Sequence, residues 1–111
     1  MFSADEKMQI FLEGSKYLTW DVNGAGFSAT NPCLQIEIRI SRKQEEVLEF
    51  RGFKSHFSYE LAIRKQNSCD YTYVRTGDYS SECDKLLKEL YRTAQHSAQT
   101  SLLGDDLIST G

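Results

Sequence analysis

The segment from Cys33 to Ser41 constrains the fold of this chain more than any other stretch. Four aliphatic side chains alternate there with four polar ones: Leu34, Ile36, Ile38 and Ile40 against Gln35, Glu37, Arg39 and Ser41. Side chains of a β-strand point to opposite faces in turn, so this pattern predicts a strand with one buried and one solvated face. Such a strand is typical of an antiparallel sheet that is covered on one side only.

Weaker alternations predict the other strands. We expect them at residues 17–22, 26–30, 47–51, 59–64 and 71–75, while residues 53–58 receive no assignment. Asn23-Gly24 fits a tight hairpin turn, Ser41 to Glu45 reads as a polar turn, and Gly52 is expected to break a strand. Because the links are short, the sequence favours an antiparallel meander of five or six strands.

Helices are expected at both ends. Ser3 and Glu6 have the spacing of a capping box, which predicts a short helix over residues 4–13 that stops at Gly14. A strand through Met8, Ile10 and Leu12 is the competing interpretation. A long helix from Ser80 or Ser81 to about Thr100 carries an apolar stripe that would cover the sheet: Cys83, Leu86, Leu87, Leu90, Tyr91, Ala94 and Ala98.

The predicted fold class is therefore α+β, with both helices packed on one face of the sheet. At 111 residues the chain is expected to be a single domain, 1–111. Residues 101–111 are expected to form a loosely docked tail, held if at all by its aliphatic side chains: Leu102, Leu103, Leu107 and Ile108.

Composition narrows the class of protein. No apolar run approaches the roughly 18 residues of a membrane helix, and the N-terminus lacks the basic and apolar regions of a secretory signal. Three cysteines without C-x-x-C spacing fit reduced thiols, so a cytoplasmic location is expected. Cys33 and Cys83 are expected to face the core, and Cys69 to lie in a turn.

Catalytic and metal sites find little support. The carboxylates of Asp21, Glu37, Glu49 and Glu60 fall in the polar phase of their strands, where pairing with neighbouring arginines is the simpler interpretation. His56 and His96 lack ligand spacing to other histidines or cysteines. We therefore expect no enzyme activity, no cofactor and no metal. Gly24-Ala25-Gly26 lies between strands and reads as a turn, not a phosphate loop.

Charge suggests a binding partner. The net charge is -3, and acidic residues gather toward the ends of the chain, notably at one cluster: Asp78, Glu82, Asp84 and Glu89. Our leading hypothesis is a non-catalytic, cytoplasmic protein-protein interaction domain. Its most specific form is an acidic immunity protein or antitoxin that neutralises a basic, nucleic-acid-cleaving toxin through this cluster.

Two alternatives stay open. One is a small enzyme or ligand-binding domain with a pocket between sheet and C-terminal helix, lined by Trp20, Phe50 and Tyr91 and reached by His56. The other is single-stranded nucleic-acid binding by the open sheet face, where aromatic and basic residues mix in 51–57 and 71–75. Ordinary sheet packing explains the same aromatics, so nucleic acid is the less favoured partner. The sequence does not show which sheet edge is free and so predicts no oligomeric state.

Overall fold

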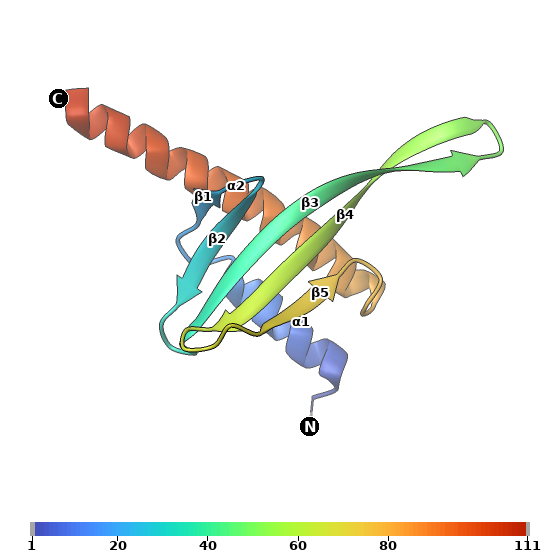
Figure 1. Ribbon diagram of the computed structural model, residues 1–111, viewed down its shortest axis with the longest axis horizontal. Coiled ribbons are helices and arrows are strands. Elements are labelled where there is room, and N and C mark those ends of the chain that lie inside the picture. The colour runs from blue at the N-terminus through green and yellow to red at the C-terminus, as the bar shows by residue number, and fades with distance from the viewer. Residues whose placement is uncertain (1, 111) are drawn as a thin grey trace.

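The computed structural model describes the backbone of residues 2–110 and the side chains of residues 2–46 and 48–100. In the sequence, one helix precedes and one follows a run of five strands (Figure 1). In chain order the elements are α1 (Ala4–Ser15), β1 (Asp21–Asn23), β2 (Gly26–Asn31), β3 (Ile36–Glu49), β4 (Gly52–Lys65), β5 (Tyr71–Arg75) and α2 (Ser81–Thr110).

The five strands form one antiparallel sheet in the order β1-β2-β3-β4-β5, which confirms the predicted meander. The predicted turn at Asn23-Gly24 is also present, because Asn23 pairs with Gly26 and Gly24 adopts a positive φ of 61°. The N-terminal strand is shorter than expected. It begins at Asp21, so Trp20 lies just before it.

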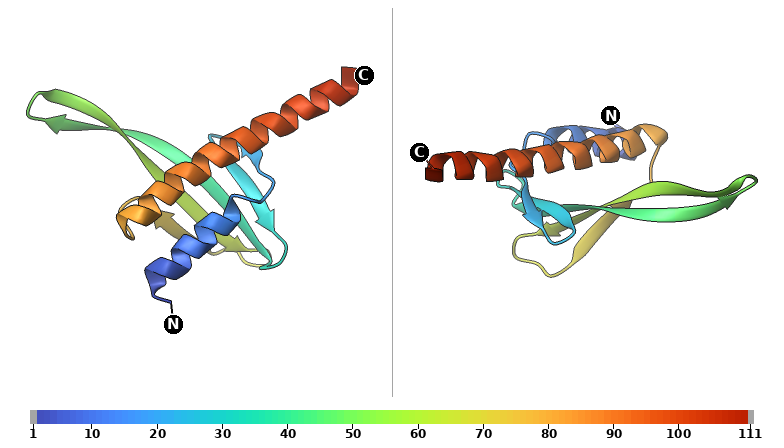
Figure 2. Two further views of the ribbon diagram at one scale, coloured as in Figure 1. Left: turned by 180° about the vertical axis from the view of Figure 1, so that it is seen from behind. Right: turned by 90° about the horizontal axis from the view of Figure 1, so that it is seen from above.

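The two layers meet as the sequence predicts, and the α+β class is confirmed. Both helices lie on one side of the sheet (Figure 2). Ile38 and Ile40 are fully buried against the stripe of α2, where Leu87 and Leu90 are buried as well. The core is thus a seam between the isoleucines of β3 and the leucines of α2.

Helix α1 is confirmed and its strand alternative is wrong. The capping box forms as predicted, since Ser3 Oγ accepts from the Glu6 amide at 3.1 Å and the Glu6 side chain accepts from the Ser3 amide. The helix does not stop at Gly14 but continues to Ser15. Ser15 is buried, and its carbonyl oxygen accepts a 3.0 Å hydrogen bond from Trp20 Nε1, so the packing of the tryptophan sets the helix end.

The start of the central strand was predicted wrongly. Cys33 and Leu34 lie exposed in the turn between β2 and β3, and the strand begins only at Ile36. Gln35 has a positive φ of 54°, which a strand residue does not adopt, and the Asn31 side chain accepts from the Leu34 amide. Cys83 is buried as expected, whereas Cys33 is not.

A further prediction is wrong at residues 41–52. Instead of a turn at 41–45 and a separate strand, β3 runs unbroken to Glu49 and pairs along its whole length with β4. The turn lies at Phe50 and Arg51, followed by Gly52 with a φ of 117° that suits glycine. Polar residues continue the strand because they pair across it, as Lys43 does with Ser58 and Glu45 with His56.

The outer half of this hairpin extends beyond the rest of the sheet (Figure 1). We call residues 42–58 the arm. The radius of gyration is 15.9 Å, against about 13 Å for a compact domain of this length. The arm and the end of α2, which project on opposite sides, account for the excess.

Helix α2 is longer than predicted and includes most of the segment expected to be a tail. Its backbone continues without a break to Thr110. The aliphatic side chains that were expected to dock this segment lie outside the described ones: Leu102, Leu103, Leu107 and Ile108. Among the described residues, no helix is both long and apolar enough to cross a membrane.

Asp5 joins the two helices. Its carboxylate accepts hydrogen bonds from the backbone amide and the hydroxyl of Ser80, both at 2.9 Å, and from Gln9 Nε2 at 2.6 Å. These bonds, the Ser80 amide first, lower the pKa of Asp5 from 3.8 to about 2. Burial and the Asp5 carboxylate raise the pKa of the neighbouring Cys83 thiol, which is therefore held protonated.

The lowered pKa predicts a pH-dependent stability. Because the folded state holds the Asp5 carboxylate ionised below its ordinary value, its contribution is complete above about pH 4 and is lost as the pH falls toward 2. We expect Asp5→Asn to be less stable than wild type at neutral pH, and the difference to shrink over that interval. Urea denaturation at stepped pH measures it. A difference that stays constant down to pH 2 would contradict the assigned role of Asp5.

Candidate functional site

The arm carries the largest exposed apolar side chains that lie together in the sequence. Four of them are solvent-exposed to the following degrees: Leu48 72%, Phe50 105%, Phe53 75% and Phe57 47%. Exposed apolar residues are common singly, but a cluster on a projecting element is typical of an interaction surface. The arm is therefore the candidate site.

Three of these side chains share one side of the arm. Leu48 is the register partner of Phe53. Phe53, Phe57 and Leu61 follow one another at every fourth position along an unbroken strand. They therefore lie on the face whose inner part packs against α2. The helices cover only that inner part, and the arm extends past them (Figure 2). We call Leu48, Phe53 and Phe57 the apolar side of the arm.

Tyr91 anchors the base of the arm to α2. Its ring contacts the rings of Phe27 and Tyr59, with centroids 5.4 and 5.5 Å away. The guanidinium of Arg42 lies 4.9 Å from the centroid of Tyr91 and 4.2 Å from that of Phe57. This cation–π contact holds the first arm residues of both strands against the core.

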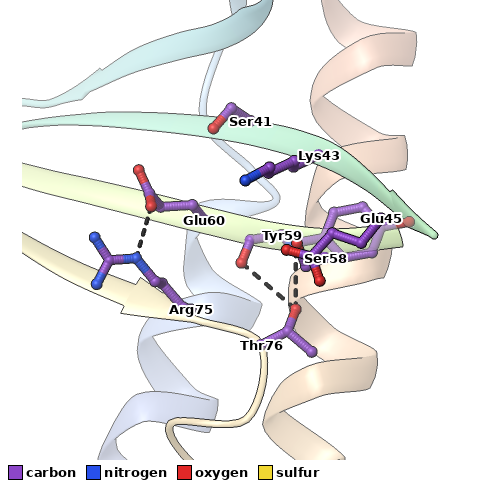
Figure 3. A pocket seen from close by; sticks show the side chains of 8 residues that line it. All are labelled: Ser41, Lys43, Glu45, Ser58, Tyr59, Glu60, Arg75 and Thr76. Carbon is purple, nitrogen blue, oxygen red and sulfur yellow. Dashed lines mark hydrogen bonds and ion pairs between the residues drawn. The ribbon is translucent and has the colours of Figure 1, made fainter. Parts of the chain in front are cut away.

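The opposite side of the arm is polar. His56 Nε2 lies 3.4 Å from Glu49 Oε1, and both side chains are about half exposed. At the base of this side, an open hollow of about 400 Å³ is lined by charged and hydroxyl groups from β3, β4 and β5 (Figure 3). Its lining includes Lys43, Glu60 and Arg75, and Arg75 Nε donates to Glu60 Oε2 at 2.7 Å. Such a mixed-charge surface has no single ligand preference.

The predicted acidic cluster is largely used within the fold. Asp78 accepts from the Arg75 amide at 2.8 Å, and Asp84 accepts from the Gly77 amide at 3.0 Å. Glu89 pairs with Lys16 at 2.6 Å, which lowers the pKa of Glu89. Glu82 makes only a 3.5 Å contact with Lys85, and both side chains are exposed.

The open sheet face shows the predicted cross-strand charge pairs. Glu37 pairs with its register partner Arg64, and Glu60 pairs with Arg75. Tyr71 and Tyr73 stack on each other at 6.0 Å, with Arg64 and Arg75 over their rings. Both arginines therefore already have carboxylate partners on this face.

The structure does not bring the predicted pocket residues together. Trp20 is fully buried in the core and Tyr91 is buried beside β2 and β4, whereas Phe50 lies at the exposed tip of the arm and His56 on its polar side. Among the described residues, no group of three or more histidine, cysteine or acidic side chains has the geometry of a metal site.

The sequence contained a signal for the arm that the segment-by-segment prediction missed. Phe53, Phe57, Leu61 and Ile63 fall on one phase of period two, so the strand pattern of β4 extends back through residues 53–58. Polar Ser55 interrupts the apolar phase, and the turn assigned to residues 41–45 left these residues without a pairing partner.

No protein-family model matches the chain, and no match was found among the curated proteins or the solved structures compared with it.

Proposed function

We propose that this chain is a protein-binding domain that contacts its partner through the arm. The observation that carries the proposal is the exposure of Leu48, Phe50 and Phe53 on an element that projects from the core. A partner that covers these side chains gains about 25 cal/mol for each Å² of apolar surface removed from water. Aromatic side chains are also common among the residues that dominate binding energy in protein interfaces.

The shape of the arm supports a macromolecular partner. A two-stranded hairpin is marginally stable alone, and among the described side chains this one is supported at its base, through Arg42 and Tyr91. Its outer residues do not pack on the core, so their apolar character contributes little to the fold of the isolated chain. A partner protein that packs on these residues would account for their apolar character.

The experiment replaces the exposed apolar residues of the arm. In the triple variant Leu48→Ser, Phe50→Ser and Phe53→Ser, we expect captured partner proteins to be lost from native extracts, while the melting temperature changes by only about 1–2 °C because the sites are exposed. The matched control carries three exposed apolar residues elsewhere: Tyr17→Ser, Val22→Ser and Leu34→Ser. Equal capture by both triple variants would place the contact surface outside the arm.

The more specific form of the proposal is a basic toxin as partner. An acidic immunity protein would bind such a partner more weakly as salt rises, because charge attraction between exposed surfaces is screened. Of the predicted cluster, Glu82 has the weakest internal contact. Running the same capture at low and high salt tests the charge component, and capture that does not vary with salt favours a partner held mainly by the apolar side.

A further inference from the structure

We infer that the arm pairs with the arm of a second copy of this chain, through the outer edge of β4, to form a continuous four-stranded sheet. This inference rests on the proposed function, since it names the partner of the same surface.

The outer edge of β4 is free over a defined length. Strand β5 pairs with residues 60–64 only, and Thr76 then occupies the edge at Tyr59. The Thr76 amide donates to the Tyr59 carbonyl at 3.0 Å. The Tyr59 amide donates to Thr76 Oγ1 at 2.9 Å (Figure 3). The turn at Phe50 and Arg51 ends the strand on the other side. Within the described chain, residues 52–58 of β4 therefore pair only with β3.

The orientation of the free backbone groups follows from Tyr59. Its amide and carbonyl both point to the outer edge, and backbone direction alternates along an unbroken strand. Phe57, Ser55 and Phe53 must therefore point their amides and carbonyls outward too. These are the unpaired edge groups that can template another strand.

A two-fold pairing that uses the whole free edge has one possible centre. The midpoint of residues 52–58 is Ser55, so Ser55 lies opposite its own copy and Phe53 lies opposite Phe57 of the second chain. Each outward-pointing residue of one strand then lies opposite an outward-pointing residue of the other strand, so the two chains form three hydrogen-bonded pairs. The register thus follows from the boundaries of the edge and not from the side chains.

The side chains agree with that register. Phe53 and Phe57 lie on the same side of the arm, so each cross-strand pair stacks two phenylalanines, and the small Ser55 lies between the pairs. Aromatic cross-strand pairs are among the favourable pairs in antiparallel sheets. On the polar side Lys54 meets His56 of the second chain, beside Glu45, which is the register partner of His56.

The outer edge of β3 is a poor alternative. The free part of that edge runs from Ser41 to Glu49, because β2 pairs only up to Ile40. A two-fold pairing over all of it places Glu45 opposite its own copy, which brings like charges together. Pairing β3 of one chain with β4 of another leaves a free edge on each chain, so it does not close with two chains but continues to a ring or a filament. The β4 edge, with Lys54 as its only formally charged residue over 52–58, closes with two chains.

The first test is the oligomeric state. Because the paired edge is short, the interface is at the small end of specific interfaces, and we expect sedimentation to show the 12.7 kDa chain approaching twice that mass over a range from about 1 μM to about 1 mM. Ser55→Pro removes an outward amide without removing a bond to β3, and should weaken association at least about tenfold. Ser55→Thr, which keeps the amide, is the control and should associate like wild type.

The second test fixes the register. In a Cys33→Ser, Cys69→Ser background, Ser55→Cys places two thiols at a pair whose Cα atoms are about 5.5 Å apart, within disulfide range. Oxidised glutathione, which accepts the two electrons, should link the chains rapidly. Gln44→Cys, also exposed but on β3, lies about 20 Å from its copy in this sheet, three strand spacings across and four residues along, and should link slowly. Equal rates for the two variants would overturn the register.

The outcomes separate the two proposals. A wild-type chain that stays monomeric up to about 1 mM overturns the dimer, while loss of other partners from the arm variant would still support the arm as the contact surface. Self-association of the triple arm variant at wild-type strength would overturn the Phe53–Phe57 pairs of the dimer.

Discussion

Replacing Trp20 by alanine is expected to destabilise the protein by about 3–5 kcal/mol, the range for removing a large buried aromatic side chain. Trp20 is fully buried, and its Nε1 donates to the Ser15 carbonyl where α1 ends. The backbone amide of Trp20 also donates to Ser97 Oγ of α2 at 3.2 Å. One residue thus packs α1, β1 and α2 together, and the cavity left by alanine lies where they meet.

Far-UV circular dichroism in urea is the suitable measurement, because Trp20 is the only tryptophan and its fluorescence is lost in the variant. The matched variant is Trp20→Phe, which keeps most of the apolar volume and removes only the indole donor, and it should cost less than half as much as alanine. If the two variants are equally unstable, the hydrogen bond to Ser15 and not the packing governs this site.

Tyr91→Ala is expected to cost about 3–4 kcal/mol and to loosen the arm as well. The ring contacts Phe27 and Tyr59 in the sheet, and Arg42 at the base of the arm. Removing it takes away one of the two rings on which Arg42 lies, so the arm amides should exchange faster with solvent. Hydrogen exchange followed by mass spectrometry reports both effects.

Leu90→Ala provides the comparison for Tyr91. Leu90 is fully buried on the same helix, and its truncation is expected to cost about 2–4 kcal/mol. Its effect should be spread over the core, without the additional protection loss in residues 42–58. Tyr91→Phe should keep both stability and arm protection. Arm exchange that rises equally in the Leu90 and Tyr91 variants would show that Tyr91 has no particular role there.

The parts of the fold that follow from local chemistry were predictable from the sequence. The capping box at Ser3 and Glu6, the turn at Asn23-Gly24 and the stripe of α2 each depend on residues close in the sequence. The alternation of Ile36, Ile38 and Ile40 identified the buried face because one side of the sheet is covered along that stretch.

The candidate site was less predictable for a physical reason. A period-two pattern reveals a strand through the contrast between buried and exposed positions, and the arm has no buried side. Arg42 and Gln44 lie on the same face of β3 as Ile38 and Ile40, but they are exposed, so the apolar alternation stops at Ile40. Cross-strand pairing extends β3 regardless, through backbone bonds that any residue can make. Likewise, sequence does not reveal the backbone amides that the carboxylates of Asp78 and Asp84 bind.

The position of α2 after the five strands has a consequence for synthesis. The strands can pair hairpin by hairpin as they leave the ribosome, because each is joined to the next by a short link. The isoleucines of β3 are covered by the leucines of α2 only when that helix has emerged. Until then the nascent chain presents an open apolar sheet, the kind of intermediate that chaperones bind.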